Sequence, residues 1–266
     1  MPVTCIAVLP LVMGVVNVTP DSFSDGGRYF DTDAAIAHAR RLIAEGADVI
    51  DVGGESTRPG AVPVAEDEEC SRVIPVIEAV GGDVRVSIDT RKAAVARAAV
   101  AAGATLINDV SASLWTVAAE TGVAWSAMHM QGQPPTMQSE PHYDDVVAEV
   151  RDFLVQRAMR AVDDGVEEVW IDPGIGFGKT TAHNLSLLGH LDALVATGFP
   201  VLVGTSRKRF LGVLLGESDG CNEPAAIDDR LEGSLATATW AMAQGAGMVR
   251  VHDVKASVEA AKVVAA

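Results

Sequence analysis

One arrangement of residues recurs along the whole chain and constrains its fold more than any other feature. A helix-forming segment ends at a glycine, a short apolar run follows, and a polar residue closes that run. The clearest copy begins at the capping residues 31–33, passes Ile36, Ala39 and Ile43 at helical spacing, and ends at Gly46 before the apolar run 48–52. Further strands are predicted at 11–16, 84–88, 105–109, 123–129, 169–172, 200–204 and 248–252.

Apolar strands that alternate with helices are typical of a parallel sheet covered on both faces. About eight such units within 266 residues favour a closed (β/α)8 TIM barrel over an open, doubly wound sheet. The open sheet is the main alternative, but no G-x-G-x-x-G follows the first strand. No linker-like change of composition divides the chain. We therefore predict a single α/β barrel domain over residues 1–266.

The charge balance limits the ligands. The chain has 20 Lys and Arg against 36 Asp and Glu, a formal net charge of −16. Binding to nucleic acid or to an anionic membrane surface requires clustered basic residues, so we expect neither partner. An anionic ligand would need a local basic site.

The cysteines and the longest apolar stretch bear on the compartment. Cys5, Cys70 and Cys221 are odd in number and far apart, which predicts neither a disulfide framework nor a zinc site and favours a cytoplasmic protein. The apolar stretch 5–16 contains Pro10 and Gly14 and is too short to span a bilayer. We interpret it as the first buried strand.

Polar residues follow every predicted strand. In a (β/α)8 barrel the chemistry gathers at the carboxyl ends of the strands. A single Asx residue after a strand commonly closes a turn or caps a helix, and Asp51 and Asp109 are candidates for that role alone. The complete set is less easily explained by turns and predicts a site at the barrel mouth. The set is Asn17, Asp51, Glu55, Asp89, Asn108, Asp109, His129, Asp172, Ser206, Arg207, Lys208, Arg250 and His252.

The glycine-rich segment 172–180 resembles a phosphate-binding P-loop only at its end. The first glycine of that pattern would fall at Pro173, so a P-loop NTPase is rejected. We expect the glycines to let the backbone approach a flat ligand, with Asp172 pointing into the barrel mouth.

Two groups of strand-end residues suggest the ligand. Arg250 and His252 lie on one side of the last strand, beside the 206–208 segment, where many barrels bind phosphate. Asp89, Asn108 and Asp172 offer acceptors and a donor suited to the edge of an aminopyrimidinone ring. The residues alone therefore predict a barrel enzyme that binds a polar planar heterocycle with an anionic tail.

Several motifs carry a family resemblance over nearly the whole chain, in order. Residues 13–27 (MGVVNVTPDSFSDGG), 51–60 (DVGGESTRPG) and 172–179 (DPGIGFGK) closely resemble the dihydropteroate synthase family of pterin-binding barrels, as do the shorter segments 87–90, 107–109, 128–132, 206–208 and 250–254. The resemblance implies condensation of 6-hydroxymethyl-7,8-dihydropterin diphosphate with para-aminobenzoate, with Mg²⁺, to give 7,8-dihydropteroate and diphosphate. It also implies a cytoplasmic homodimer that is a sulfonamide target.

The resemblance assigns roles residue by residue. Asp89, Asn108, Asp172 and Lys208 would recognise the pterin, although position alone suggests phosphate for Lys208. Asn17 would bind the metal, and Arg250 and His252 the diphosphate. Thr57 and Arg58 belong to one loop that would close over the site with Asp21 and Phe23 of another. Phe177, Lys208 and Pro59 would shape the para-aminobenzoate slot. The catalytic candidates are Lys208, Asp89, Asp21 and Arg58.

Three alternatives remain. A methyltetrahydrofolate-dependent methyltransferase shares the pterin pocket but needs no diphosphate clamp, so Arg250 and His252 favour the synthase. A non-catalytic pterin-binding paralogue would have lost Asn17, Arg58 or Lys208, and all three are present. A phosphate-binding barrel isomerase is disfavoured because no paired catalytic Glu and His is evident.

Overall fold

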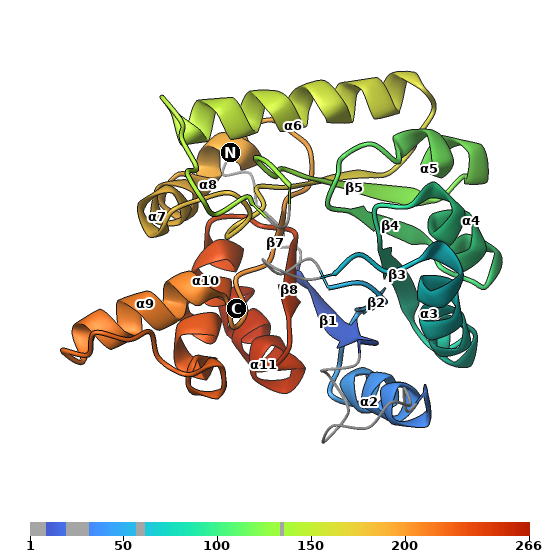
Figure 1. The fold of residues 1–266 in the computed structure, drawn as a ribbon, viewed down its shortest axis with the longest axis horizontal. Coiled ribbons are helices and arrows are strands. Elements are labelled where there is room, and N and C mark those ends of the chain that lie inside the picture. The colour runs from blue at the N-terminus through green and yellow to red at the C-terminus, as the bar shows by residue number, and fades with distance from the viewer. Residues whose placement is uncertain (1–8, 20–31, 57–61, 134–135) are drawn as a thin grey trace.

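Parallel strands form the wall of a barrel in the computed structural model, which describes residues 9–19, 32–56, 62–133 and 136–266. Within these residues eight strands adjoin in the order β6-β5-β4-β3-β2-β1-β8-β7, and a bridge between Ile171 and Val201 links the two outermost strands (Figure 1). The predicted barrel is confirmed and the open sheet was wrong. The strands are β1 Leu11–Asn17, β2 Val49–Gly53, β3 Arg85–Asp89, β4 Leu106–Asp109, β5 Ala124–Met128, β6 Val169–Asp172, β7 Leu202–Val203 and β8 Met248–Val251.

Helices surround the strands (Figure 1). The glycines predicted to end the repeated units all have positive φ, a conformation that glycine adopts without steric cost: Gly46, Gly103, Gly122, Gly165, Gly198 and Gly245. The helices are α2 Thr32–Ala44, α3 Glu66–Val80, α4 Ala93–Ala101, α5 Trp115–Thr121, α6 Val146–Asp163, α7 Thr181–Gly189, α8 Leu191–Val195, α9 Arg209–Ser218, the short 3-10 helix η1 Ile227–Asp229, α10 Leu231–Ala243 and α11 Val254–Val264.

The core has two parts. The larger lies between the strands and the helices. The smaller consists of Met13, Val49, Leu106, Ala124, Trp170, Leu202 and Met248.

The smaller cluster explains why polar side chains reach the barrel mouth. Strand side chains alternate between two faces, so the residue two positions after an inward apolar residue also points inward. In β2, β4, β6 and β8 those later residues are, in turn, Asp51, Asn108, Asp172 and Arg250. An apolar floor therefore supports a polar layer above it.

The predicted strand ends need small corrections. The run predicted at 200–204 forms a strand only at Leu202–Val203, since Pro200 has no N–H to donate, although its carbonyl accepts a hydrogen bond from Ile171 N at 3.0 Å. Among the described residues no helix is both long and apolar enough to cross a membrane.

Candidate active site

The ends of the first four strands lie in register. Asn17 pairs with Gly53, Gly53 with Asp89, and Asp89 with Asn108, so three polar side chains belong to one layer. Gly53 contributes no side chain to that layer. A Cβ at Gly53 would lie 3.7 Å from Asp89 Oδ2 and 3.8 Å from Asn17 Oδ1, so both oxygens border this glycine.

Arg250 connects this layer to the one below. Its Nε donates to Asp51 Oδ2 at 2.6 Å and its Nη2 donates to Asp89 Oδ2 at 2.7 Å. Asn108 Nδ2 also donates to Asp51 Oδ2, at 3.1 Å. Strands β2, β3, β4 and β8 thus share one network of charge-assisted hydrogen bonds. We call it the Arg250 network, and its members are Asp51, Asp89, Asn108 and Arg250.

Burial shifts the pKa values of this network. Burial raises the pKa of Asp89 to about 7, and Arg250 opposes the shift by favouring the ionised carboxylate. Burial alone would lower the pKa of Arg250, but the carboxylates of Asp51 and Asp89 outweigh it and raise that pKa further. The arginine therefore stays charged.

Asp172 and Lys208 form a second buried group beside the network. Asp172 Oδ1 accepts a hydrogen bond from Gly174 N at 2.7 Å. Burial raises the pKa of Asp172, and the nearby Lys208 opposes that shift. Burial lowers the pKa of Lys208 to about 8, with Asp172 acting in the opposite direction. A flat ligand at this place would meet a carboxylate and an amine, each of which favours the charged form of the other.

Lys208 lies over the glycine-rich loop. Its Nζ donates to the carbonyl of Ile175 and lies 4.8 Å from the centre of the Phe177 ring. The structure thus places Lys208 next to Phe177 and within electrostatic range of Asp172.

The reason for two glycines in this loop differs from the prediction. Gly174 and Gly178 have positive φ, and a Cβ on either would clash with backbone of the β5–α6 segment: 1.9 Å from His129 O and 2.2 Å from Gln131 O, respectively. Close packing of two loops, rather than the approach of a ligand, requires these glycines. A Cβ at Gly176, in contrast, would meet the Lys208 side chain at 3.2 Å.

Lys179 links the same glycine-rich loop to His129 at the end of β5, and the sequence analysis did not predict this contact. Its Nζ lies 3.0 Å from His129 Nδ1 and donates to the carbonyl of Phe177 at 3.0 Å. Burial lowers the pKa of Lys179 to about 7, and burial followed by the charge of Lys179 lowers the pKa of His129 to about 3. His129, a predicted strand-end candidate, is thus a buried neutral partner of Lys179.

The ends of β7 and β8 are tied together by side chains. Ser206 Oγ lies 2.9 Å from His252 Nδ1 and accepts a hydrogen bond from His252 N at 3.1 Å. Arg207 Nη2 contacts Asp253 Oδ1 at 2.7 Å. The hydroxyl of Ser206 therefore orients the imidazole of His252.

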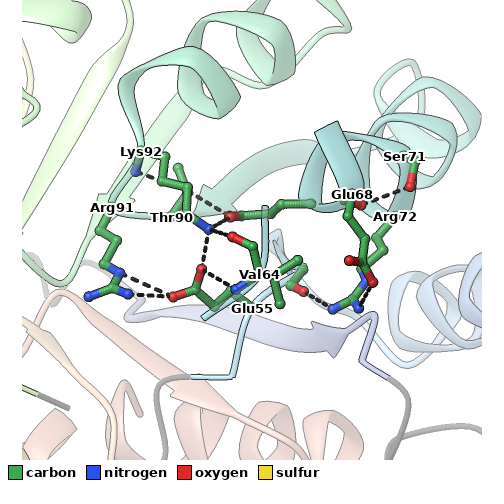
Figure 2. Close-up of polar contacts among 10 residues, drawn as sticks. Glu55, Val64, Glu68, Ser71, Arg72, Thr90, Arg91 and Lys92 are labelled. Carbon is green, nitrogen blue, oxygen red and sulfur yellow. Dashed lines mark hydrogen bonds and ion pairs between the residues drawn. The ribbon is translucent and has the colours of Figure 1, made fainter. Parts of the chain in front are cut away.

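Two predicted strand-end carboxylates have structural partners. Asp109 accepts hydrogen bonds from the backbone N–H groups of Ser111, Ser113 and Leu114, so it closes the turn before α5, as one interpretation held. Glu55 binds Lys92 and also Arg91, at 2.8 Å (Figure 2).

The neighbouring polar contacts fix the strand ends behind the site. Lys92 also donates to the carboxylate of Glu69 and to the carbonyl of Val64, at 2.7 Å in the second case (Figure 2). Thr90 Oγ1 donates to Glu69 Oε1 at 2.7 Å, so the residue after Asp89 is anchored to α3.

Three inward polar atoms have no hydrogen-bond partner among the described residues: Asp51 Oδ1, Ser87 Oγ and Ser126 Oγ. Buried polar atoms are rarely left unpaired, so a bound molecule or water would be expected to satisfy them. Sequence reasoning missed Ser87 and Ser126, and it included Asp51 in the strand-end set while leaving open a role in a turn alone. The alternation could have found all three, because each lies two positions before a residue at its strand end.

Some predicted residues lie outside the described residues: Asp21, Phe23, Thr57, Arg58 and Pro59. Their assigned roles stay predictions. In the part of the chain that is described, no group of three or more His, Cys, Asp or Glu side chains is arranged to hold a metal ion.

Comparison with known proteins identifies the family. The sequence model of a family described as "Pterin binding enzyme" matches residues 13–252. The dihydropteroate synthase of Mycobacterium leprae (strain TN) is 49% identical over 266 residues, covering 96% of this chain and 92% of the relative.

Solved structures agree. Xanthomonas albilineans dihydropteroate synthase with 4-aminobenzoic acid has a TM-score of 0.87 at 50% identity, covering 96% of this chain and 91% of that one. The same enzyme in complex with 7,8-dihydropteroate has a TM-score of 0.83 at 48% identity, covering 96% and 92%. The chain therefore belongs to the pterin-binding enzymes and, within them, to the dihydropteroate synthase family.

Proposed function

We infer that the chain is a dihydropteroate synthase, which joins para-aminobenzoate to 6-hydroxymethyl-7,8-dihydropterin diphosphate and releases diphosphate. The observation that carries this inference is the Arg250 network, in which side chains from β2, β3, β4 and β8 meet at one barrel mouth. Relatives of this chain that cover nearly all of it are named for that activity, and one was solved with its product.

The pterin is held, in this proposal, between the two buried groups. Asp172 faces the edge of the ring that carries parallel N–H donors, because a carboxylate binds such an edge with two hydrogen bonds. Asp89 and Asn108 contact the ring from neighbouring strands, and Lys208 donates to one of its acceptors. Support for this placement is the burial of Asn108 and Asp172 to 4% and 5% exposure, which leaves them accessible chiefly from the barrel mouth.

The chemistry needs charge neutralisation more than a strong base. The amine of para-aminobenzoate is neutral when it attacks the exocyclic methylene, and diphosphate leaves as an anion. We propose that departure of diphosphate leads bond formation, so that positive charge develops on the methylene, with Asp89 close enough to stabilise it. A secondary isotope effect clearly above unity at that methylene is expected; an effect near unity would contradict a dissociative path.

Arg250 and His252 would hold the diphosphate. A guanidinium has five N–H donors, and the contacts of Arg250 to Asp51 and Asp89 use two of them. His252 is oriented by Ser206 and adds a second donor when protonated. The carboxylates of Asp51 and Asp89 keep Arg250 protonated.

Asn17 is the proposed ligand of Mg²⁺. This ion prefers oxygen ligands and commonly binds through one or two protein oxygens, several waters and substrate phosphates. Asn17 Oδ1 and Asp89 Oδ2 both border Gly53, so two oxygen atoms of the kind that Mg²⁺ prefers lie near each other at the strand ends. When bound, the ion would neutralise charge on the leaving group.

A cytoplasmic homodimer is proposed as well. Leu185 of α7 and Trp240 of α10 are large apolar side chains that are 45% and 48% exposed, and Trp240 Nε1 donates to the carbonyl of Leu188 at 2.8 Å, so both helices present one surface. Covering that surface with a second copy would bury it. Light scattering should give the mass of a dimer, and Trp240→Glu should give the mass of a monomer.

A diphosphate-release assay tests the function. Release should require both the dihydropterin diphosphate and para-aminobenzoate. Binding of the pterin without any release would instead identify a non-catalytic paralogue, and transfer of a methyl group from methyltetrahydrofolate to a corrinoid would identify a methyltransferase.

A further inference from the structure

Arg207 has an unusual backbone for a residue with a large side chain. Its φ is 58°, in the left-handed region, which residues other than glycine adopt only at a steric cost. The residue lies between Ser206, which contacts His252, and Lys208, which lies over Phe177. Strained residues of this kind persist only where the surroundings hold them, so their contacts are informative.

Side chains around α10 hold the Arg207 backbone on both sides. Arg207 N donates to Ser234 Oγ at 2.9 Å, and Arg230 Nη1 donates to the carbonyl of Arg207 at 3.0 Å. Arg230 is itself anchored by a hydrogen bond from its Nε to the carbonyl of Ala225, at 3.0 Å. The backbone N–H and the carbonyl of Arg207 therefore both form hydrogen bonds with side chains from outside the loop.

The Arg207 side chain points to the next strand end. Its guanidinium contacts Asp253 through two hydrogen bonds, Nη2 to Oδ1 at 2.7 Å and Nε to Oδ2 at 3.2 Å. A two-bond arginine–carboxylate contact fixes orientation as well as distance. The Asp253 side chain makes no capping hydrogen bond to α11, so this ion pair is its principal contact.

The contacts continue the pairing of β7 with β8 beyond the ends of the strands. In the sheet Leu202 pairs with Met248 and Val203 with Val249. Ser206 contacts His252 and Arg207 contacts Asp253 at the same sequence offset. Side-chain contacts thus join the segments after β7 and β8, where backbone pairing has stopped.

We propose that Arg207 is a positioning residue, whose ion pair with Asp253 holds Lys208 and His252 in the arrangement that binds the dihydropterin diphosphate. The proposal rests on the proposed function, since that function gives the pterin to Lys208 and the diphosphate to His252. Arg207 itself touches neither substrate. Loss of the pair should therefore raise the Michaelis constant for the pterin substrate, and raise that for para-aminobenzoate only as far as Lys208 also shapes its slot.

Asp253→Asn is the sharpest test because it keeps the shape of the side chain and removes its charge. Glu120→Gln is the matched control: Glu120 accepts from Arg97 through both carboxylate oxygens, Nη2 to Oε2 at 2.8 Å and Nε to Oε1 at 3.3 Å, on the exposed surfaces of α4 and α5. Arg207→Gly is the second variant, since glycine adopts the left-handed backbone without strain and lacks the guanidinium.

The expected result is a fall in kcat/KM for the dihydropterin diphosphate of about tenfold to a hundredfold in Asp253→Asn and in Arg207→Gly, the range that small displacements of positioned groups cause. The double variant should fall no further than either single one, because both changes remove one contact. Glu120→Gln should retain wild-type kinetics, and melting temperatures of Asp253→Asn and Glu120→Gln should agree within about 3 °C.

Two results would overturn the role of Arg207: kcat/KM for the pterin substrate within twofold of wild type in Asp253→Asn, or additive losses in the double variant. If the wild-type chain released no diphosphate, the proposed function would fail instead.

Discussion

Replacing Asp51 with asparagine tests whether the Arg250 network holds the strand ends together. Asp51 is fully buried, and its Oδ2 accepts one hydrogen bond from Arg250 Nε at 2.6 Å and one from Asn108 Nδ2 at 3.1 Å. Asparagine has nearly the same shape but no charge, so the change leaves Arg250 with Asp89 as its remaining charged partner in the network.

The magnitude follows from these contacts. A hydrogen bond to a charged group contributes about 1.5–3 kcal/mol, and the amide oxygen of asparagine retains part of it. We therefore expect Asp51→Asn to lower the free energy of unfolding by about 2 kcal/mol, and the melting temperature by about 4–8 °C. Pterin affinity should fall as well, since Asn108 and Arg250 lose the acceptor that orients them.

Chemical unfolding at pH 7 measures the first effect, and calorimetric titration with the pterin measures the second. Asp48→Asn is the matched control, because Asp48 lies directly before the other end of β2, where its Oδ2 accepts a hydrogen bond from Val12 N at 2.8 Å. An unfolding free energy within about 0.5 kcal/mol of wild type, the usual range for surface changes, would refute a stabilising network.

Three further predictions follow from the same side chains. Asp172→Asn should weaken pterin binding by about 1–3 kcal/mol, because a buried acceptor becomes mispaired; unchanged affinity in a calorimetric titration would remove Asp172 from the pocket. The pKa of Lys179 is about 7 in the folded chain and 10.5 ordinarily, so the unfolded chain binds more protons between these values and stability should rise with pH there, by up to about 1.4 kcal/mol per unit. Urea unfolding at pH 7, 8 and 9 should show that rise in wild type and a smaller one in Lys179→Met; equal slopes would contradict a buried amine. Lys208→Ala should lower turnover in the diphosphate-release assay without unfolding the chain, and wild-type turnover would disprove the assigned role.

The repeated unit made the fold predictable. Each glycine that was expected to end a helix adopts positive φ, and the apolar runs that follow became strands of the barrel. The exception is β7, where Pro200 cannot donate a backbone hydrogen bond and only Leu202 and Val203 pair as a strand. Strand pairing depends on which adjacent strand supplies backbone donors and acceptors, and the spacing of residues in the sequence does not identify that strand.

The site was predictable in its residues and less so in its contacts. Position at the strand ends predicted a converging set, and the structure places Asn17, Asp89 and Asn108 of that set in one layer, since parallel strands bring their ends to one edge. The partner of a charged side chain is a matter of three-dimensional packing. Arg250 was expected to hold phosphate, and its spacing did not predict that its guanidinium would also bridge Asp51 and Asp89.

Lys179 shows a second limit. In the sequence it belonged to a rejected P-loop pattern, and no spacing rule links it to His129, which lies 50 positions earlier. Burial then lowers the pKa of Lys179, because it disfavours the charged amine.

The most direct measurement follows the product itself. Purified chain mixed with 6-hydroxymethyl-7,8-dihydropterin diphosphate, para-aminobenzoate and Mg²⁺ should form 7,8-dihydropteroate in equal amount to the diphosphate released, as mass spectrometry would show. Asp172→Asn and Lys208→Ala should each form far less. No dihydropteroate from the wild-type chain, or undiminished formation by both variants, would contradict a synthase built on these strand ends.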